Sequence, residues 1–191
     1  MIRRPPRSTP KPSSAASDVY KRQMHKRSNL GIKYLPQEPS IFQNLTVYEN
    51  LFGLAELTFK NNNDIKTSVE KLLDEFDLIE IRDLKGRQLS GGQRRKVEIA
   101  RTLVSNPKMI LLDEPFAGID PIAIEEIKKV LNTLKNKGIG ILITDHNVRE
   151  TLEICDHAAI INNGEIIAHG TKENLISNQV VKDVYLGNMY N

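Results

Sequence analysis

The chain has 191 residues, a formal net charge of +3 and a single cysteine, Cys155. This length suits one domain with a sizeable core, and no apolar run approaches the ~20 residues that a membrane-spanning helix needs. One cysteine excludes an internal disulfide and fits a reducing compartment, with core packing as its expected role.

The first 23 residues differ from the rest of the chain. They are rich in Pro, Ser and Arg and poor in large apolar side chains, which predicts disorder. They hold the whole basic excess of the chain, so the remaining residues carry a slightly negative net charge. We therefore expect no nucleic-acid binding by the body of the chain. Prolines at positions 5, 6, 10 and 12 prevent the amphipathic helix of a targeting presequence. The segment resembles translated adaptor sequence, and we exclude it from fold reasoning.

A short strand over residues 31–35 and a loop bounded by Pro36 and Pro39 are predicted next. Thr46 is a suitable N-cap for a helix from Val47 toward Leu57. Asparagines 61–63 are expected to end that helix, and apolar spacing over 65–76 predicts a second, amphipathic one. Two interpretations of an apolar set in this region stay open, a binding groove and a buried core: Phe42, Leu45, Val47, Tyr48, Leu51 and Phe52.

Residues 89–93, Leu-Ser-Gly-Gly-Gln, open a third predicted helix that runs to Val104. Ser90 is placed as its N-cap. The free N–H groups and the positive dipole end of a helix start favour phosphate, and Gly91 and Gly92 allow an oxygen to approach the backbone closely. The basic cluster at 94–96 could contact phosphate, but a solvated face is the preferred interpretation.

Residues 109–112 form an uninterrupted apolar run, typical of a strand buried on both faces of a parallel sheet. Asp113 and Glu114 follow at its carboxyl end, where such sheets bind ligands. Adjacent residues of an extended chain point to opposite faces, so the two acids are expected to differ in role. In phosphoryl transfer, Asp113 fits the holding of Mg²⁺ and Glu114 the activation of the attacking water.

The rest of the chain continues the alternation of helix and strand. Asp120 and Pro121 open a helix that Gly138 stops, and the strand 140–144 ends at Asp145-His146. Asn147 caps a helix through Ile154, and a hairpin over 158–168 turns at residues 162–164. Thr171 is expected to cap a short helix, and residues 180–186 form a further short amphipathic element.

The segments 89–93, 109–114 and 117–120, in this order and spacing, resemble the signature, Walker B and D-loop segments of the ABC-type ATPases. The resemblance implies an α/β P-loop NTPase fold with a parallel-sheet core and a helical subdomain, and it implies ATP and Mg²⁺ as cofactors. It also implies a head-to-tail dimer in which the signature of one copy closes over the nucleotide of the other. Ser90, Gly91, Gly92, Gln93 and Asp120 are then the nucleotide-binding residues.

Two further residues gain a role from the resemblance alone. Gln37 falls on the Q-loop glutamine, which reaches Mg²⁺ and the attacking water, so it joins Asp113 as a metal ligand. His146 falls on the H-loop histidine, which contacts the γ-phosphate. The implied catalytic residues are Glu114, His146 and Gln37. The apolar set from Phe42 would meet the coupling helix of a transmembrane permease subunit.

Within the family, four segments are especially similar to the ATP-binding subunits of lipopolysaccharide exporters: 34–38, 97–101, 114–121 and 144–151. This similarity implies a peripheral homodimer at the cytoplasmic face of the inner membrane that powers lipopolysaccharide extraction without touching the transported substrate. Two alternatives stay open, an ATPase of a branched-chain amino-acid importer and a soluble ABC protein outside transport.

The motif G-x-x-x-x-G-K-S/T, the Walker A loop that holds phosphates, does not occur in the 191 residues. We therefore expect a partial domain over 24–191 that lacks about its first third and does not hydrolyse ATP as it stands. The expected division is a helical subdomain at about 45–105, the remaining core at 106–170 and a tail at 171–191.

Overall fold

Residues 24–181 are described by the computed structural model of the chain. The disorder expected for 1–23, and most of the element expected over 180–186, fall outside these residues. In chain order the elements are α2 (Met24–Asn29), β1 (Ile32–Leu35), α3 (Val47–Thr58), α4 (Asn62–Glu75), two short 3-10 helices (Ile79–Ile81 and Gly86–Gln88), α5 (Gly91–Leu103), β2 (Met109–Asp113), α6 (Pro121–Asn136), β3 (Gly140–Thr144), α7 (Val148–Ile154), β4 (Ala158–Asn162), β5 (Glu165–Gly170), α8 (Lys172–Ser177) and α9 (Gln179–Val181).

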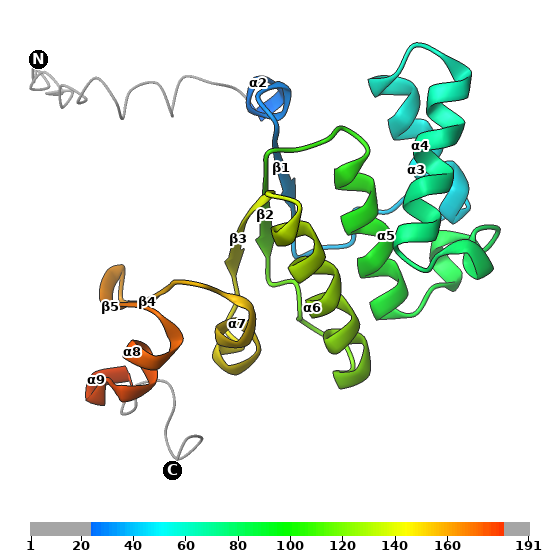
Figure 1. The fold of residues 1–191 in the computed structure, drawn as a ribbon. Coiled ribbons are helices and arrows are strands. Elements are labelled where there is room, and N and C mark those ends of the chain that lie inside the picture. The colour runs from blue at the N-terminus through cyan, green and yellow to red at the C-terminus, as the bar shows by residue number, and fades with distance from the viewer. Residues whose placement is uncertain (1–23, 182–191) are drawn as a thin grey trace, which may run out of the picture.

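A parallel sheet of β1, β2 and β3, in that order, forms the centre of the fold. Leu35, Leu112 and Ile143 lie level with one another across it, so the carboxyl ends of all three strands share one edge. Helix α5 packs on β1 and α6 on β3, on the same side of the sheet (Figure 1). The predicted α/β class with a parallel-sheet core is confirmed.

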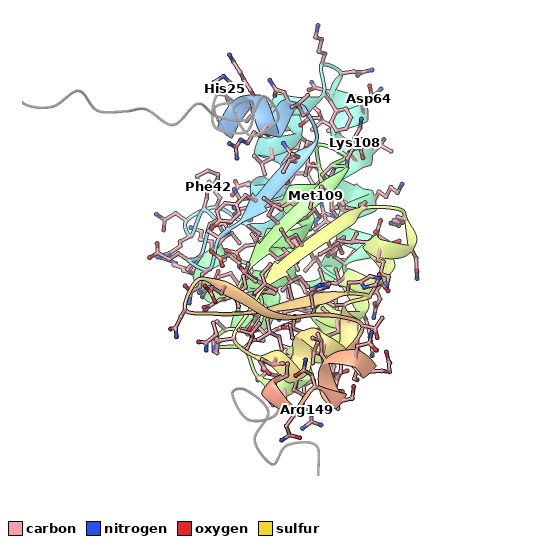
Figure 2. The ribbon with its side chains drawn as sticks, turned by 90° about the vertical axis from the view of Figure 1, so that its left-hand side faces the viewer. His25, Phe42, Asp64, Lys108, Met109 and Arg149 are labelled. Atoms are coloured by element: carbon pink, nitrogen blue, oxygen red, sulfur yellow. The ribbon has the colours of Figure 1, made fainter. Side chains whose placement is uncertain are left out.

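The prediction that residues 109–112 are buried on both faces is wrong. Ile110 and Leu112 are buried against the helices, whereas Met109 and Leu111 are only half-buried on the opposite face. That face is turned to the viewer in Figure 2, and none of the described helices covers it. Tyr34 and Leu142, which flank Leu111, expose 47% and 52% of their surface there.

Helix starts follow local capping chemistry. Thr46, Asn147 and Thr171 each accept a backbone N–H from the first turn of the helix that they precede, as predicted. The asparagine run behaves differently from expectation. Helix α3 ends at Thr58, and the Asn61 side chain accepts the Asn63 N–H at 3.0 Å. The run therefore begins α4 and does not end α3, because asparagine is a favoured N-cap.

Helices α3 and α4 pack together and α3 packs on α5, beside the sheet (Figure 1). The main core is continuous from these helices to the sheet. The β4–β5 hairpin turns at Asn163 and Gly164, both with positive φ, as the Asn-Gly pair predicted. A second, smaller core joins α7 to the hairpin and α8, and it contains Leu152, Ile160, Ala168, Leu175 and Val181. None of the described helices combines the length and hydrophobicity needed to span a bilayer.

Candidate active site at the carboxyl ends of the parallel strands

Asp113, the last residue of β2, is held by hydroxyl groups from both neighbouring strands. Thr144 Oγ1 donates to Asp113 Oδ1 at 2.6 Å, and the Tyr34 hydroxyl donates to Oδ2 at 2.9 Å. These two hydrogen bonds hold the pKa of Asp113 below its ordinary value, and the bond from Thr144 has the larger effect. Asp113 therefore stays ionised, and each of its oxygens keeps a lone pair for a cation.

Tyr34→Phe is expected to raise the pKa of Asp113 toward its ordinary value of about 3.9, because one of the two stabilising hydroxyl donors is lost. A carboxyl group whose pKa is lowered by folding stabilises the fold at pH values above its ordinary, unfolded-state pKa. That stabilisation is lost as the pH falls through the folded-state pKa. The pH dependence of stability near acid pH should therefore weaken in the variant. Carboxyl ¹³C NMR titration measures the pKa, and Tyr48→Phe is the matched control. An unchanged Asp113 pKa in Tyr34→Phe would contradict the assignment.

Glu114 leaves the strand and turns toward two other side chains. Its φ is +43°, a left-handed conformation that is costly for a residue other than glycine. Gln37 Nε2 donates to Glu114 Oε2 at 2.6 Å, and His146 Nδ1 lies 3.5 Å from Oε1. Asp113 and Glu114 have separate partners, as expected. They point apart because the backbone turns at Glu114, and not because they alternate along an extended strand.

These contacts bring three strand ends together. Gln37 follows β1, Glu114 follows β2 and His146 follows β3, and the Glu114 N–H also donates to the Thr144 carbonyl at 2.7 Å. The described contacts thus place the three predicted catalytic side chains in one cluster beside Asp113. Carboxylate and amide oxygens are the ligands that Mg²⁺ prefers, so Asp113, with Gln37, suits a metal site chemically.

Asp145 lies next to His146 in this cluster and was not among the predicted site residues. Its side chain is 1% exposed, and it accepts N–H groups from Phe116 at 3.3 Å and Asn147 at 2.7 Å. It therefore joins the loop after Glu114 to the loop that carries His146. The sequence signal was an acid directly after the predicted strand 140–144.

The interpretation of residues 94–96 as a solvated basic face is wrong for Arg95. Its side chain is 6% exposed and donates to the carbonyls of Pro36 and Asp113, both at 2.9 Å. Arg95 also pairs with Glu98 at 3.2 Å, and Glu98 accepts the Ser40 N–H at 2.7 Å. Arg95 thus fixes the loop of Gln37 against the end of β2. Opposite charges three residues apart on a helix were the available signal.

Ser90 caps α5, as predicted. Its side chain accepts the Gln93 N–H at 3.2 Å, and Gln93 Oε1 accepts the Ser90 N–H at 3.0 Å. The first-turn N–H groups of a helix have no partner within it, so this start keeps anion-binding capacity. A cavity of about 120 Å³ lies between Gly91 and the catalytic cluster, lined also by Gln37, Glu114 and Gly118.

The other predicted nucleotide-binding residues lie close to this helix start. Asp120 caps α6 by accepting the Ala123 N–H at 3.0 Å. Gly92 is buried, and a Cβ added there would lie 2.3 Å from the Ala123 Cβ. The absence of a side chain at Gly92 is therefore explained by the contact between α5 and α6.

Gly92→Ala is expected to lower the free energy of unfolding by about 1–3 kcal/mol, because the new methyl group overlaps Ala123. Urea unfolding measures the change. Gly53→Ala is the matched control: its Cβ meets nothing within 4 Å in α3, so a gain of about 0.5–1 kcal/mol is expected. Gly92→Ala combined with Ala123→Gly should recover part of the loss. An unchanged free energy of unfolding in Gly92→Ala alone would contradict the overlap with Ala123.

This combination of sheet, strand-end side chains and capped helix start defines an ABC-type ATPase cassette, and solved structures agree. An ATP-binding cassette of an ABC transporter in its ADP conformation matches with a TM-score of 0.74 at 33% identity, over 85% of this chain and 70% of that one. CbiO1 of Clostridium perfringens, part of the transporter complex cbiONQ, matches with a TM-score of 0.74 at 28% identity, over 87% and 68%.

Sequence comparison identifies the family. The family model described as "ABC transporter" matches residues 11–117, and this match begins inside the segment 1–23. The lipopolysaccharide export system ATP-binding protein LptB of Haemophilus influenzae is 53% identical over 168 residues, 87% of this chain and 70% of that protein. Its Escherichia coli K12 counterpart is 49% identical over 165 residues, 86% and 68%. The chain belongs to the ABC transporter family, as an ATP-binding component.

Proposed function

We propose that this chain is the ATP-binding subunit of a transporter that uses ATP hydrolysis to extract lipopolysaccharide from the inner membrane, acting at its cytoplasmic face. The observation that carries the hydrolytic part is the cluster of Gln37, Glu114 and His146 beside Asp113. The assignment of lipopolysaccharide as the substrate rests on relatives of that function that are 53% and 49% identical to the chain. In this proposal the chain does not itself contact the transported molecule.

Each residue of the cluster has a distinct task in this proposal. Asp113 and the amide oxygen of Gln37 would hold Mg²⁺, which when bound neutralises phosphate charge. Glu114 accepts a proton from the attacking water, and its bond from Gln37 fixes one carboxylate oxygen. His146, 3.5 Å from the other oxygen, orients Glu114 and would contact the terminal phosphate of bound ATP.

A second copy of the chain completes the site in the proposal. Ser90 and Gly91 are exposed at the positive end of α5, where their backbone can meet phosphate held by another copy. Because the 191 residues contain no G-x-x-x-x-G-K-S/T loop, we expect the purified polypeptide alone to show no ATP turnover. Turnover above background that disappears in Glu114→Gln would contradict this expectation.

A groove beside α3 suits the transmembrane subunit. The apolar set that left two interpretations open divides between them: Val47 and Leu51 are fully buried, whereas Phe42 exposes 56% of its surface. Next to it lies a cavity of about 900 Å³ whose lining includes Leu57 and Arg101. Leu57 is 84% exposed, and the Arg101 guanidinium lies 5.0 Å from the centre of the Phe42 ring. We assign this groove to a helix of the permease.

Genetic complementation tests the proposed function. A chimeric cassette, in which an amino-terminal segment with a phosphate-binding loop from an ABC ATPase precedes residue 24, is expressed in Escherichia coli depleted of its own lipopolysaccharide export ATP-binding protein. Growth, and copurification of the membrane subunits, are expected for the chimera, and growth is lost in its Glu114→Gln form. Turnover without growth or copurification would favour the importer or the soluble alternative.

A further inference from the structure

Lys128 occupies an unusual environment on α6. Its side chain is 6% exposed, and its ammonium group contacts three carboxylates: Glu125 at 2.9 Å, Glu150 and Glu153. Oxygens of the three carboxylates lie within 4.8 Å of one another, so Lys128 offsets a repulsion among them. Burial by itself lowers the pKa of Lys128, but the three bonds outweigh burial and raise it, so the group stays charged.

Two of these carboxylates belong to α7, the helix that begins directly after His146. Glu150 lies in its first turn, where its N–H donates to the capping side chain of Asn147 at 3.4 Å. The Val148 N–H donates to the His146 carbonyl at 3.0 Å. Through Glu150, Lys128 therefore links α6 to the first turn of α7, which is hydrogen-bonded to the His146 carbonyl.

Apolar packing holds the start of α7 only weakly to α6. Val148, at its start, and Leu152, its buried side chain, pack in the smaller core with the hairpin and not on α6, and Ile154, at the far end of the helix, is partly buried on the main core. The His146 side chain is 73% exposed, so its position beside Glu114 depends on its backbone, which lies between the loop held by Asp145 and the start of α7. Of the two α7 carboxylates that Lys128 binds, Glu150 lies at the end of the helix nearest His146 and Glu153 lies in its last turn.

We propose that Lys128 is a positioning residue for His146: by binding Glu150 and Glu153 it fixes α7 on α6 and so holds the imidazole beside Glu114. Its catalytic relevance rests on the proposed function, but the positional claim does not. Glu125 also binds Lys128 but lies on α6 itself, so its bond joins no second helix. Glu125 therefore provides a built-in control.

The test is a mutant cycle in the full 191-residue chain, read from the Cε1–H NMR signals of its four histidines. Glu114→Gln is expected to move the His146 signal because the two side chains are in contact. In the Lys128→Met and the Glu150→Gln/Glu153→Gln backgrounds, we expect that movement to fall below about half, as for coupled sites. Glu125→Gln and Lys129→Met, the latter at the neighbouring exposed lysine, should leave it intact, and Lys128→Arg should largely restore it.

A full movement of the His146 signal in both uncoupling backgrounds would overturn the proposal. If Lys128→Met does not fold by circular dichroism, the Glu150→Gln/Glu153→Gln background decides, because Lys128 keeps its Glu125 partner there. The proposed function fails separately: a chimeric cassette with His146→Gln and undiminished ATP turnover would remove the catalytic role of His146 and leave the positional coupling unaffected.

Discussion

Glu114→Gln in the chimeric cassette is expected to lower the rate of ATP hydrolysis by about 10²- to 10⁴-fold, the usual contribution of a general base. The amide keeps the size of the side chain but cannot accept a proton from water. The carboxylate is held by Gln37 at 2.6 Å and faces His146 at 3.5 Å, so it is placed for that transfer. Phosphate release under saturating ATP and Mg²⁺ measures the rate.

The control for this variant is Glu80→Gln, at an exposed acid in the short 3-10 helix Ile79–Ile81, which should keep the full rate. Binding of ATP should survive in Glu114→Gln, because the acid acts on water and not on the nucleotide. A hydrolysis rate within twofold of the parent rate would exclude Glu114 as the base, since the expected loss is at least about 100-fold.

Arg95→Met is expected to lower the free energy of unfolding of the 191-residue chain by about 3–5 kcal/mol, because it leaves a buried carboxylate without its ion partner. The Arg95 and Glu98 side chains are 6% and 2% exposed, so water cannot replace the lost contact. The carbonyls of Pro36 and Asp113 also lose a donor. Urea unfolding at neutral pH measures the difference.

Lys96→Met is the matched control on the next residue. Lys96 pairs with Glu126 at 2.9 Å; the Lys96 side chain is 12% exposed, but Glu126 is 49% exposed, so water can solvate the carboxylate when the lysine is removed, and we expect a loss of only about 1 kcal/mol. Adding Glu98→Met to Arg95→Met should recover part of the loss, because the unpaired charge is then removed. Equal effects of Arg95→Met and Lys96→Met would show that the buried pair carries no special energy.

Features decided by neighbouring residues were predictable from the sequence. The helix starts at Thr46, Ser90, Asp120, Asn147 and Thr171 all follow expectation, because a cap needs only a side chain and the first turn beside it. The Asn-Gly hairpin turn is local in the same way. The Asn61 run misled because asparagine serves both ends of helices, and the sequence does not say which helix it belongs to.

Features decided by distant contacts were not predictable. The environment of Arg95 depends on carbonyls of Pro36 and Asp113, 59 and 18 residues away. The open face of β2 depends on where helices lie over the sheet, which an apolar run does not encode. Gln37 and His146 were proposed only from the order of family motifs, since a lone glutamine or histidine in a loop carries no signal by itself.

In the proposed dimer, acids at the strand ends of one copy and the helix start at Ser90 of another enclose the same nucleotide. Light scattering of the Glu114→Gln chimeric cassette detects this arrangement through the mass of the particle. We predict the mass of two copies with ATP and Mg²⁺ and of one copy without them, and a single copy throughout for a further Ser90→Asp change, which keeps the helix cap but repels phosphate. A cassette that binds ATP in calorimetry yet keeps the mass of one copy would rule out a nucleotide shared between two copies.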